Sequence, residues 1–282
     1  MLSGAGPEPS GSRRCGVLGD PIAHSLSPAL HRAGYATLGL AWTYESERVA
    51  GDGLADFLAS CDASWRGLSL TMPLKRTALA LAPEVTERAR LAGAANTLLL
   101  EDGAVVLADN TDLPGAVAAV RERYDGPVSA GTVLGGGATA ASTGLALCQL
   151  GARTVTLLAR SPERAADAAA AVRRHPSRPR VEVGSLEHDA VVGEVVVSTV
   201  PAAAQDAGLL ARCARVPVVF EVTYDPWPTP LAAAAAADPR QVLVGGLDLL
   251  VHQAALQFAL FTGRPAPLAE MRRAGERALA AR

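Results

Sequence analysis

Short apolar runs alternate with alanine-rich stretches along this chain, and this alternation predicts the fold class. In the first half, the runs with strand character cover residues 15–18, 42–44, 68–70, 97–100 and 105–107. In the second half, they cover residues 132–134, 154–158, 181–183, 195–197, 218–222 and 242–244. Because the alanine-rich stretches between them favour helices, strands alternate with helices. This predicts parallel sheets with crossover helices, and so an α/β protein.

A turn between the two sets of runs divides the chain into two parts. A helix is expected from about residue 114 to residue 123, and the Tyr-Asp-Gly-Pro sequence at 124–127 has the turn chemistry of a hinge. The poly-alanine run at 231–237 is a strong helix former. The last predicted helices, at 249–261 and from residue 266 onward, precede no further strand. We therefore expect them to pack on the first domain.

Composition and charge narrow the possible partners and the compartment. The chain has 282 residues, enough for two domains, and its formal net charge of −2 gives no reason to expect a nucleic-acid or anionic-membrane partner. No stretch reaches the roughly 20 apolar residues of a membrane span. Residues 1–14 are rich in Gly, Ser and Pro, which predicts a disordered tail and no secretory signal. The cysteines are scattered, so we expect a cytoplasmic protein without disulfides or bound metal.

The segment 67–75, GLSLTMPLK, carries the strongest chemical signal. It is typical of a buried strand that stops at Thr71, since Pro73 cannot continue a central ladder but suits the first turn of a helix. Lys75 is therefore expected where a strand ends and a helix begins, which is where α/β proteins place their chemistry. A lysine there is a reactive group or a cation for an anionic ligand; taken alone, it is more often a surface lysine.

The segment 132–141, TVLGGGATAA, predicts a strand, a glycine turn and a helix of small residues. Gly135, Gly136 and Gly137 allow close approach of a pyrophosphate, and the helix that begins near Ala138 offers free N–H donors. Ala140 stands at the third glycine position, where alanine is an accepted variant. The alternative is a glycine-rich turn that binds nothing.

The next predicted strand, 154–158, ends without the acidic residue that NAD-binding folds place near the ribose 2′-hydroxyl. Arg160 stands there instead, and Arg164 follows one helical turn later. Such a guanidinium pair suits a 2′-phosphate and therefore NADP(H). For Arg164, a solvated helix face is an equally good interpretation.

Several polar residues of the first half have both a functional and a local interpretation. Ser25 and Ser27 point the same way on an extended segment and could bind a carboxylate or a diol, although Ser27 before a proline is also a good N-cap. Asn96 could cap a turn, and Asp112 could cap the following helix. The histidines at 24, 31 and 252 have no visible partner, so we interpret them as structural or solvated.

Together these segments resemble the shikimate dehydrogenase family from residue 16 to about residue 267. The matching motifs lie at 19–28, 69–75, 93–97, 110–112, 135–137, 159–161, 224–230, 246–247 and 252–255. The resemblance implies a Rossmann-like NADP-binding domain at 113–246 and a three-layer α/β substrate-binding domain at 15–112 plus 247–282, flanking a cleft. Four positions depart from the family pattern: Ser69, Ala159 and Asp225 each replace a usual asparagine, and Ser161 replaces a usual threonine.

The resemblance also implies roles for individual residues. Lys75 and Asp112 would form the catalytic pair. The residues implied for substrate binding are Ser25 and Ser27 at the carboxylate, Thr71, Asn96 and Gln253 at the ring hydroxyls, and Tyr224 lining the cleft. The residues implied for cofactor binding are Gly135, Gly136, Gly137, Ala138, Arg160, Arg164, Thr199 and Gly246.

The activity implied is the reversible NADPH-dependent reduction of 3-dehydroshikimate to shikimate on the route to chorismate and the aromatic amino acids, by a monomer or homodimer. Two alternatives remain at this point. One keeps the chemistry but takes quinate or an amino-substituted shikimate. The other is a cofactor-binding regulator without turnover, against which the presence of both Lys75 and Asp112 argues.

Overall fold

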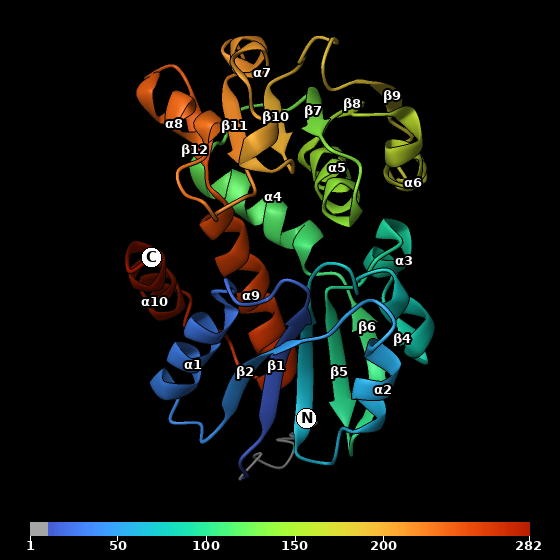
Figure 1. Cartoon of the computed structure of the whole chain (residues 1–282), viewed down its shortest axis with the longest axis vertical. Helices are drawn as coiled ribbons and strands as arrows, with labels where there is room; N and C mark the ends of the chain where they lie inside the picture. The colour runs from blue at the N-terminus through green and yellow to red at the C-terminus, as the bar shows by residue number, and fades with distance from the viewer. Residues whose placement is uncertain (1–10) are drawn as a thin grey trace, which may run out of the picture.

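Two six-stranded sheets, one from each half of the chain, form the cores of two domains (Figure 1). The protein is described here by a computed structural model, and the described residues are 11–282. The strands of the first sheet are β1 (Arg14–Gly19), β2 (Thr43–Arg48), β3 (Trp65–Leu70), β4 (Glu84–Val85), β5 (Thr97–Glu101) and β6 (Ala104–Asp109). The helical segments of this domain are α1 (Ser27–Thr37), α2 (Leu54–Ala59), η1 (Thr77–Leu81), α3 (Glu87–Ala92), α9 (Gly246–Thr262) and α10 (Leu268–Ala280).

The first sheet has the order β2-β1-β3-β5-β6-β4 and is mixed. β5 runs antiparallel to both β3 and β6, so the expectation of a parallel sheet is wrong for this domain. The pairing of β5 with β6 is explained by a two-residue hairpin loop between them, formed by Asp102 and Gly103 with φ angles of 50° and 81°. Positive φ at both positions matches the twist of a tight hairpin, and Asp-Gly is its sequence signal.

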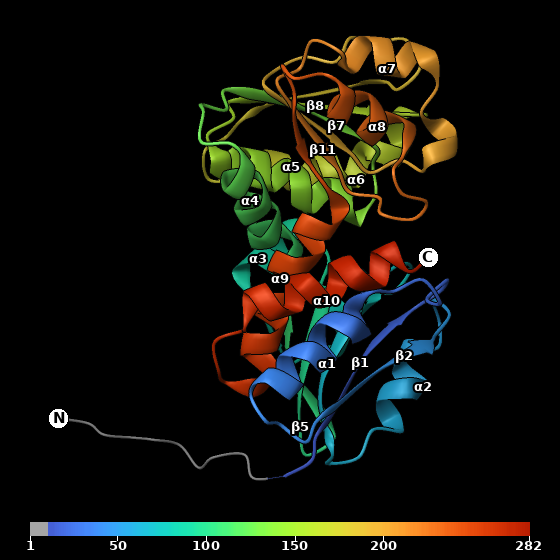
Figure 2. The same cartoon turned by 90° about the vertical axis from the view of Figure 1, so that its left-hand side faces the viewer.

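Side chains alternate between the two faces of this sheet and pack into two separate hydrophobic cores. Val17 of β1 packs with α1, α9 and α10, whereas the next residue, Leu18, packs with α2 and the η1 segment. Figure 2 shows α1, α9 and α10 together over one face of the sheet. The expectation that the last helices pack on the first domain is confirmed.

The second sheet is parallel throughout and has the order β12-β11-β10-β7-β8-β9. Its strands are β7 (Ala130–Leu134), β8 (Thr154–Ala159), β9 (Arg180–Ser185), β10 (Val195–Ser198), β11 (Val218–Glu221) and β12 (Val242–Val244). Its helical segments are α4 (Asp112–Arg123), α5 (Ala138–Leu150), α6 (Pro162–Arg173), η2 (Ala202–Ala204), α7 (Ala207–Cys213) and α8 (Pro230–Ala237). This is the doubly wound order of dinucleotide-binding folds, with a switch point where β7 and β10 lie side by side.

Two long helices, α4 and α9, carry the chain between the two sheets and cross closely (Figure 1). A Cβ atom added at Gly115 of α4 would lie 2.9 Å from the Cβ of Gln253 in α9. A glycine is required at this crossing because any side chain would push the two helices apart. The crossing also brings Gln253 next to the first turn of α4.

The expected tail at 1–14 is wrong at its last residues. Residues 1–10 lie outside the described part of the chain. Arg14 is the first residue of β1, and its guanidinium lies 4.5 Å from the centre of the Trp65 ring. Arg13 donates a hydrogen bond of 2.6 Å to the Ala63 carbonyl oxygen. These contacts with the first sheet order the residues just before the apolar run.

We predict that Gly67→Ala destabilises the first domain. Gly67 lies in β3 against the buried ring of Phe261, and an added Cβ would lie 2.1 Å from a ring carbon. Such overpacking costs about 1–3 kcal/mol of unfolding free energy, measurable by urea denaturation. Gly51→Ala is the control, because its added Cβ would lie 3.4 Å from Pro73, an ordinary contact. Equal stability of the two variants would contradict the prediction.

Candidate functional site

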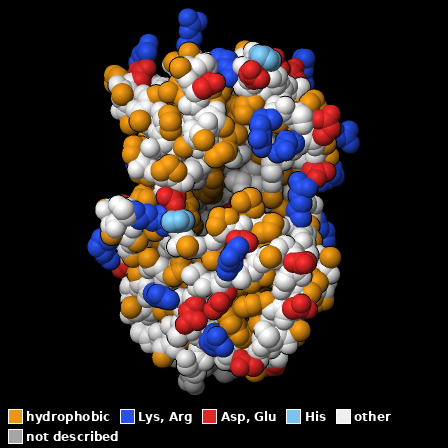
Figure 3. Space-filling model, in the orientation of Figure 1, with side chains coloured by type: hydrophobic (Ala, Val, Ile, Leu, Met, Phe, Trp, Pro, Cys, Tyr) orange, Lys and Arg blue, Asp and Glu red, His pale blue; other side chains and the backbone are white. Residues whose placement is uncertain are grey.

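Two cavities lie between the domains and meet at the end of β3. The first, of about 430 Å³, is lined by all the residues expected to bind substrate and by the expected catalytic pair. The second, of about 640 Å³, is lined by the glycine turn after β7 and the start of α6. Thr71, Met72, Lys75 and Thr139 line both cavities. Figure 3 shows the hollow between the two halves.

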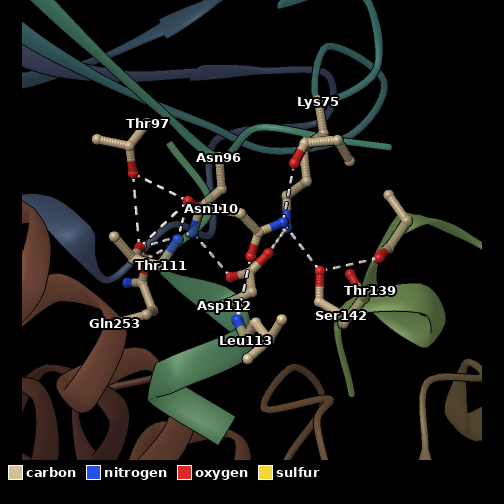
Figure 4. Close-up of polar contacts among 12 residues, drawn as sticks. Lys75, Asn96, Thr97, Asn110, Thr111, Asp112, Leu113, Thr139, Ser142 and Gln253 are labelled. Carbon is tan, nitrogen blue, oxygen red and sulfur yellow. Dashed lines mark hydrogen bonds and ion pairs between the residues drawn. The ribbon is translucent and has the colours of Figure 1, made fainter. Parts of the chain in front are cut away.

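Lys75 and Asp112 form an ion pair at this junction (Figure 4). The Lys75 Nζ lies 2.6 Å from Asp112 Oδ2, and the side chains are only 14% and 8% exposed. Lys75 follows the end of β3 as expected, but the helix after it is a 3-10 segment that begins at Thr77. Asp112 is the first residue of α4 and its side chain makes no cap, so the N-cap interpretation of Asp112 is wrong.

Asn96 fixes the other oxygen of this carboxylate. Its Nδ2 donates to Asp112 Oδ1 at 2.9 Å and to Thr111 Oγ1 at 2.9 Å, while its Oδ1 accepts from the Thr111 backbone N–H at 2.8 Å. These partners lie on the next strand-to-helix connection, so Asn96 is not a local turn cap. Its buried amide therefore orients Asp112 toward Lys75.

Gln253 adds a third chain segment to the same polar cluster. It projects from α9, and its Oε1 accepts from Asn96 Nδ2 at 3.2 Å. Its Nε2 donates to the Leu250 carbonyl oxygen at 2.9 Å, which fixes the orientation of the amide. Figure 4 shows Asn96, Thr111 and Gln253 converging from three segments on the start of α4.

Ser25, Ser27 and Tyr224 also line the first cavity. The N-cap interpretation of Ser27 is wrong, because Leu26 occupies that position and Ser27 is the first helical residue of α1. Ser25 Oγ instead accepts from the Ser27 backbone N–H at 3.3 Å. Burial raises the pKa of the Tyr224 hydroxyl, although the nearby Arg282 guanidinium opposes this. Tyr224 is therefore a neutral hydroxyl in this cavity.

The glycine turn of the second cavity is enclosed by backbone and side chains from two other elements. A Cβ at Gly135, which has a φ of 120°, would lie 2.2 Å from Thr199 Oγ1. A Cβ at Gly136 would lie 2.1 Å from the Arg164 carbonyl oxygen. Gly137 is the N-cap of α5, so the free N–H groups of that helix open onto the cavity. Only glycine fits at 135 and 136, and the turn is a cradle for an anion.

Arg160 and Arg164 line the same cavity from the end of β8 and the start of α6. Both are exposed, and neither guanidinium makes a hydrogen bond or an ion pair with another residue of 11–282. Two unpaired guanidinium groups at one cavity wall form a site for a doubly charged anion. Ala138 and Thr199 also line this cavity, whereas Gly246, expected at the cofactor, lines the first cavity instead.

The histidines fall into different environments. His31 is fully buried and stacks on Tyr44 at 4.1 Å, and burial lowers its pKa to about 3, so it is neutral and structural as expected. His252 lies 2.8 Å from a Glu122 carboxylate oxygen. His24 lies at the rim of the first cavity, where its Nδ1 is 3.3 Å from Asp225 Oδ2.

The sequence interpretation missed Asp109, a buried carboxylate that directly precedes the 110–112 segment of the site. Asp109 ends β6 and is 1% exposed, and its carboxylate accepts from Thr86 Oγ1 and Arg88 Nε at 2.6 Å each. Burial opposes its ionisation, but Arg88, Thr86 and the Asn110 amide outweigh burial and hold its pKa below the ordinary value of an aspartate. The signal was available, since an aspartate at the end of an apolar strand needs a partner.

Within residues 11–282, no group of three or more His, Cys, Asp or Glu side chains is arranged to bind a metal ion. None of the helices in that range combines the length and the apolar character needed to cross a membrane.

A doubly wound sheet with an anion cradle, joined to a polar cavity through a lysine–aspartate pair, defines an oxidoreductase that uses a pyridine dinucleotide. Family models agree: the shikimate dehydrogenase substrate binding domain matches residues 17–98, and the shikimate 5'-dehydrogenase C-terminal domain matches residues 246–274. A curated shikimate dehydrogenase (NADP(+)) from Aromatoleum aromaticum is 36% identical over 92% of this chain and 97% of its own length. The chain belongs to the shikimate dehydrogenase family.

Solved structures show the same relationship. Shikimate dehydrogenase from Mycobacterium tuberculosis is 39% identical, with a TM-score of 0.83 over 96% of this chain and 100% of that one. The Thermus thermophilus enzyme, solved with NADP(H) and shikimate, is 30% identical, with a TM-score of 0.79 over 94% and 99%. A Corynebacterium glutamicum quinate dehydrogenase, solved with NAD, is 26% identical, with a TM-score of 0.84 over 93% and 98%. Shikimate and quinate dehydrogenases share this fold. The substrate and cofactor preferences are therefore determined by the residues of the site and not by the fold.

We predict that Asp109 makes stability depend on acid pH. Its lowered pKa means that the ionised form stabilises the folded state above the unfolded pKa, and that this stabilisation is lost as pH falls through the folded pKa. Asp109→Asn should lower the unfolding free energy at neutral pH by about 3 kcal/mol, the lower end for a broken buried pair, because Arg88 is 35% exposed.

Urea denaturation at a series of pH values measures this effect. The Asp109→Asn variant should lack part of the acid-dependent loss seen in the unmodified protein, whereas the exposed control Asp52→Asn should retain it. An unchanged pH dependence in Asp109→Asn would show that this carboxylate is not the acid-sensitive group.

Proposed function

We propose that this protein is a shikimate dehydrogenase that reversibly reduces 3-dehydroshikimate to shikimate with NADPH, on the route to the aromatic amino acids. The observation that supports this most directly is the position of the Lys75–Asp112 pair, where the two cavities meet. A group that acts on both a bound ring and a bound dinucleotide must face both ligands at once. Lys75 lines both cavities.

The first cavity suits a small polyhydroxylated carboxylate. Ser25, Ser27 and Tyr224 offer hydroxyl groups for the carboxylate. Asn96 and Gln253 offer amide groups, and Thr71 a hydroxyl, for the ring hydroxyls. Because the amides of Asn96 and Gln253 are fixed by internal hydrogen bonds, they are ordered before the substrate binds.

The second cavity suits NADP(H). The glycine turn and the free N–H groups of α5 fit the pyrophosphate, and the unpaired Arg160 and Arg164 fit the 2′-phosphate. The bound cofactor supplies or accepts the hydride at the substrate carbon. The residues of the chain have the remaining task, which is to exclude water, orient the ring and manage the proton.

Lys75 carries the proton chemistry in this account. When a ketone is reduced, negative charge develops on its oxygen, and the Lys75 ammonium stabilises that charge and donates a proton to it. In the reverse direction, the lysine accepts the hydroxyl proton as the hydride leaves. Asp112 orients Lys75 throughout, and Asn96 prevents the carboxylate from rotating away.

The proposal extends to organisation. The substrate-binding domain would comprise residues 15–112 and 247–282, and the NADP-binding domain residues 113–246, because α4 and α9 begin at the points where the chain crosses the cleft. We also propose a cytoplasmic monomer or homodimer with no nucleic-acid partner, in keeping with the net charge of −2.

Nicotinamide absorbance in steady-state assays tests the proposed function. The unmodified protein should oxidise shikimate with NADP⁺ more efficiently than with NAD⁺, and should prefer shikimate to quinate. Quinate differs from shikimate by an additional hydroxyl at the carboxylate-bearing carbon, so comparing the two rings tests how the Ser25 and Ser27 part of the cavity discriminates. Faster turnover of quinate with NAD⁺ would replace the proposal with the quinate alternative, and no turnover of either ring would favour a regulator.

We predict that Lys75→Ala lowers kcat on the order of 10²- to 10⁴-fold with little change in KM, because the lysine acts mainly in the transition state. Asp112→Asn should also lower kcat severely, since Lys75 loses its orienting anion. Steady-state kinetics with shikimate and NADP⁺ measure both effects. If Lys75→Ala kept a kcat near that of the unmodified protein, Lys75 could not be the proton donor.

We predict that Ser25→Ala raises the KM for shikimate more than it lowers kcat. A hydroxyl that only binds the carboxylate contributes equally to the ground state and the transition state. Because Ser25 is also the acceptor for the Ser27 amide, the unfolding temperature of the variant serves as a control for structure. An unchanged KM in a stably folded variant would place the carboxylate elsewhere.

We predict that Arg160→Ala weakens NADPH binding roughly ten- to a hundredfold, the equivalent of one charge-assisted hydrogen bond, and barely changes NADH binding. Fluorescence titration with each cofactor measures the two dissociation constants. Equal losses for both cofactors would mean that Arg160 supports the fold and does not read the 2′-phosphate.

A further inference from the structure

A third arginine, Arg76, lines the cofactor cavity from the opposite side of the cleft. It directly follows Lys75, on the segment between β3 and η1, and so belongs to the substrate-binding side. Arg160 and Arg164 line the same cavity from the dinucleotide-binding side. Figure 3 shows Lys and Arg side chains above the hollow and at its right-hand end, on both halves of the molecule.

An ion pair fixes where the Arg76 guanidinium lies. Its Nη1 contacts Asp167 Oδ2 on α6. Residues three apart on a helix share a face, so Asp167 is the surface neighbour of Arg164. The ion pair therefore places the Arg76 guanidinium about one helical turn from a group that we assign to the 2′-phosphate.

Stability does not account for this pair. The side chains are 49% and 70% exposed, and ion pairs this exposed contribute little to stability. A guanidinium has five N–H donors, and only the Nη1 group of Arg76 has a hydrogen-bond partner among residues 11–282. Its remaining donors are available to an anion while the contact with Asp167 persists.

We propose that Arg76 is a specificity-determining residue of the cofactor site, and that it donates to the cofactor's 2′-phosphate across the cleft while Asp167 positions it. This inference rests on the proposed NADP(H) dependence. It adds a contact from the substrate-binding domain to the two arginines of the dinucleotide-binding domain. The phosphate then links the two domains next to Lys75, so cofactor choice is coupled to the position of the catalytic lysine.

Binding of 2′,5′-ADP and ADP, measured by calorimetry, tests the proposal without requiring turnover. The two probes differ in whether they carry a 2′-phosphate. Arg76→Ala should weaken 2′,5′-ADP binding about tenfold and leave ADP binding unchanged, and Arg76→Lys should fall between, because it keeps the charge but loses the planar fork. The control Arg48→Ala removes an exposed arginine that is paired with Asp20 and lines neither cavity, so neither probe should change.

The role of Asp167 is tested by a double-mutant cycle. If Asp167 acts through Arg76, Asp167→Asn should weaken 2′,5′-ADP binding when Arg76 is present. In the Arg76→Ala background, the same substitution should change the dissociation constant less than about twofold. Equal effects in both backgrounds would overturn the positioning role. Unchanged 2′,5′-ADP binding in Arg76→Ala would overturn the assignment of Arg76.

These failures are distinct from failure of the proposed function. If the unmodified protein binds 2′,5′-ADP no more tightly than ADP, the NADP(H) assignment itself is wrong, and the role of Arg76 fails with it. If the unmodified protein prefers 2′,5′-ADP and Arg76→Ala keeps that preference, only the role of Arg76 is wrong.

Discussion

The 2.6 Å ion pair between Lys75 and Asp112 is the interaction on which the arrangement of the site depends. It joins the end of β3 to the first residue of α4, and Asn96 completes it by taking the second carboxylate oxygen. Because α4 also leads from the first sheet to the second, the pair lies where the domains meet. A partly buried lysine and carboxylate require each other, since either alone would be costly at this depth.

The sequence predicted this pair in part. The stop at Thr71 and Pro73 placed Lys75 at a strand end, and the resemblance paired it with Asp112. The bond from Asn96 to Asp112 could not be predicted, because it depends on β5 and β6 lying antiparallel beside β3. That arrangement follows from the Asp102–Gly103 hairpin, a local signal that the alternation of strands and helices concealed. The capping interpretations of Asn96 and Asp112 failed because tertiary contacts use these side chains instead, and that of Ser27 failed because α1 begins at Ser27 itself.

The cofactor side was more accessible to sequence reasoning, because its signals are local. The glycine turn follows its strand directly, and Arg160 follows the next strand. What the sequence could not show is why glycine is required: Thr199 and the Arg164 backbone approach from distant segments and leave no room for a Cβ. The sequence also could not show that Arg76 lies near Arg164, because the two residues come together only where the two domains face each other across the cleft.

A crystal structure of the protein with NADP⁺ and shikimate tests the central claim most directly. The account predicts that the hydroxyl to be oxidised lies within hydrogen-bond distance of Lys75, with the carboxylate at Ser25 and Ser27 and the nicotinamide facing the ring where the two cavities meet. A shikimate ring turned so that its carboxylate meets Lys75, or bound outside this cavity, would contradict the account.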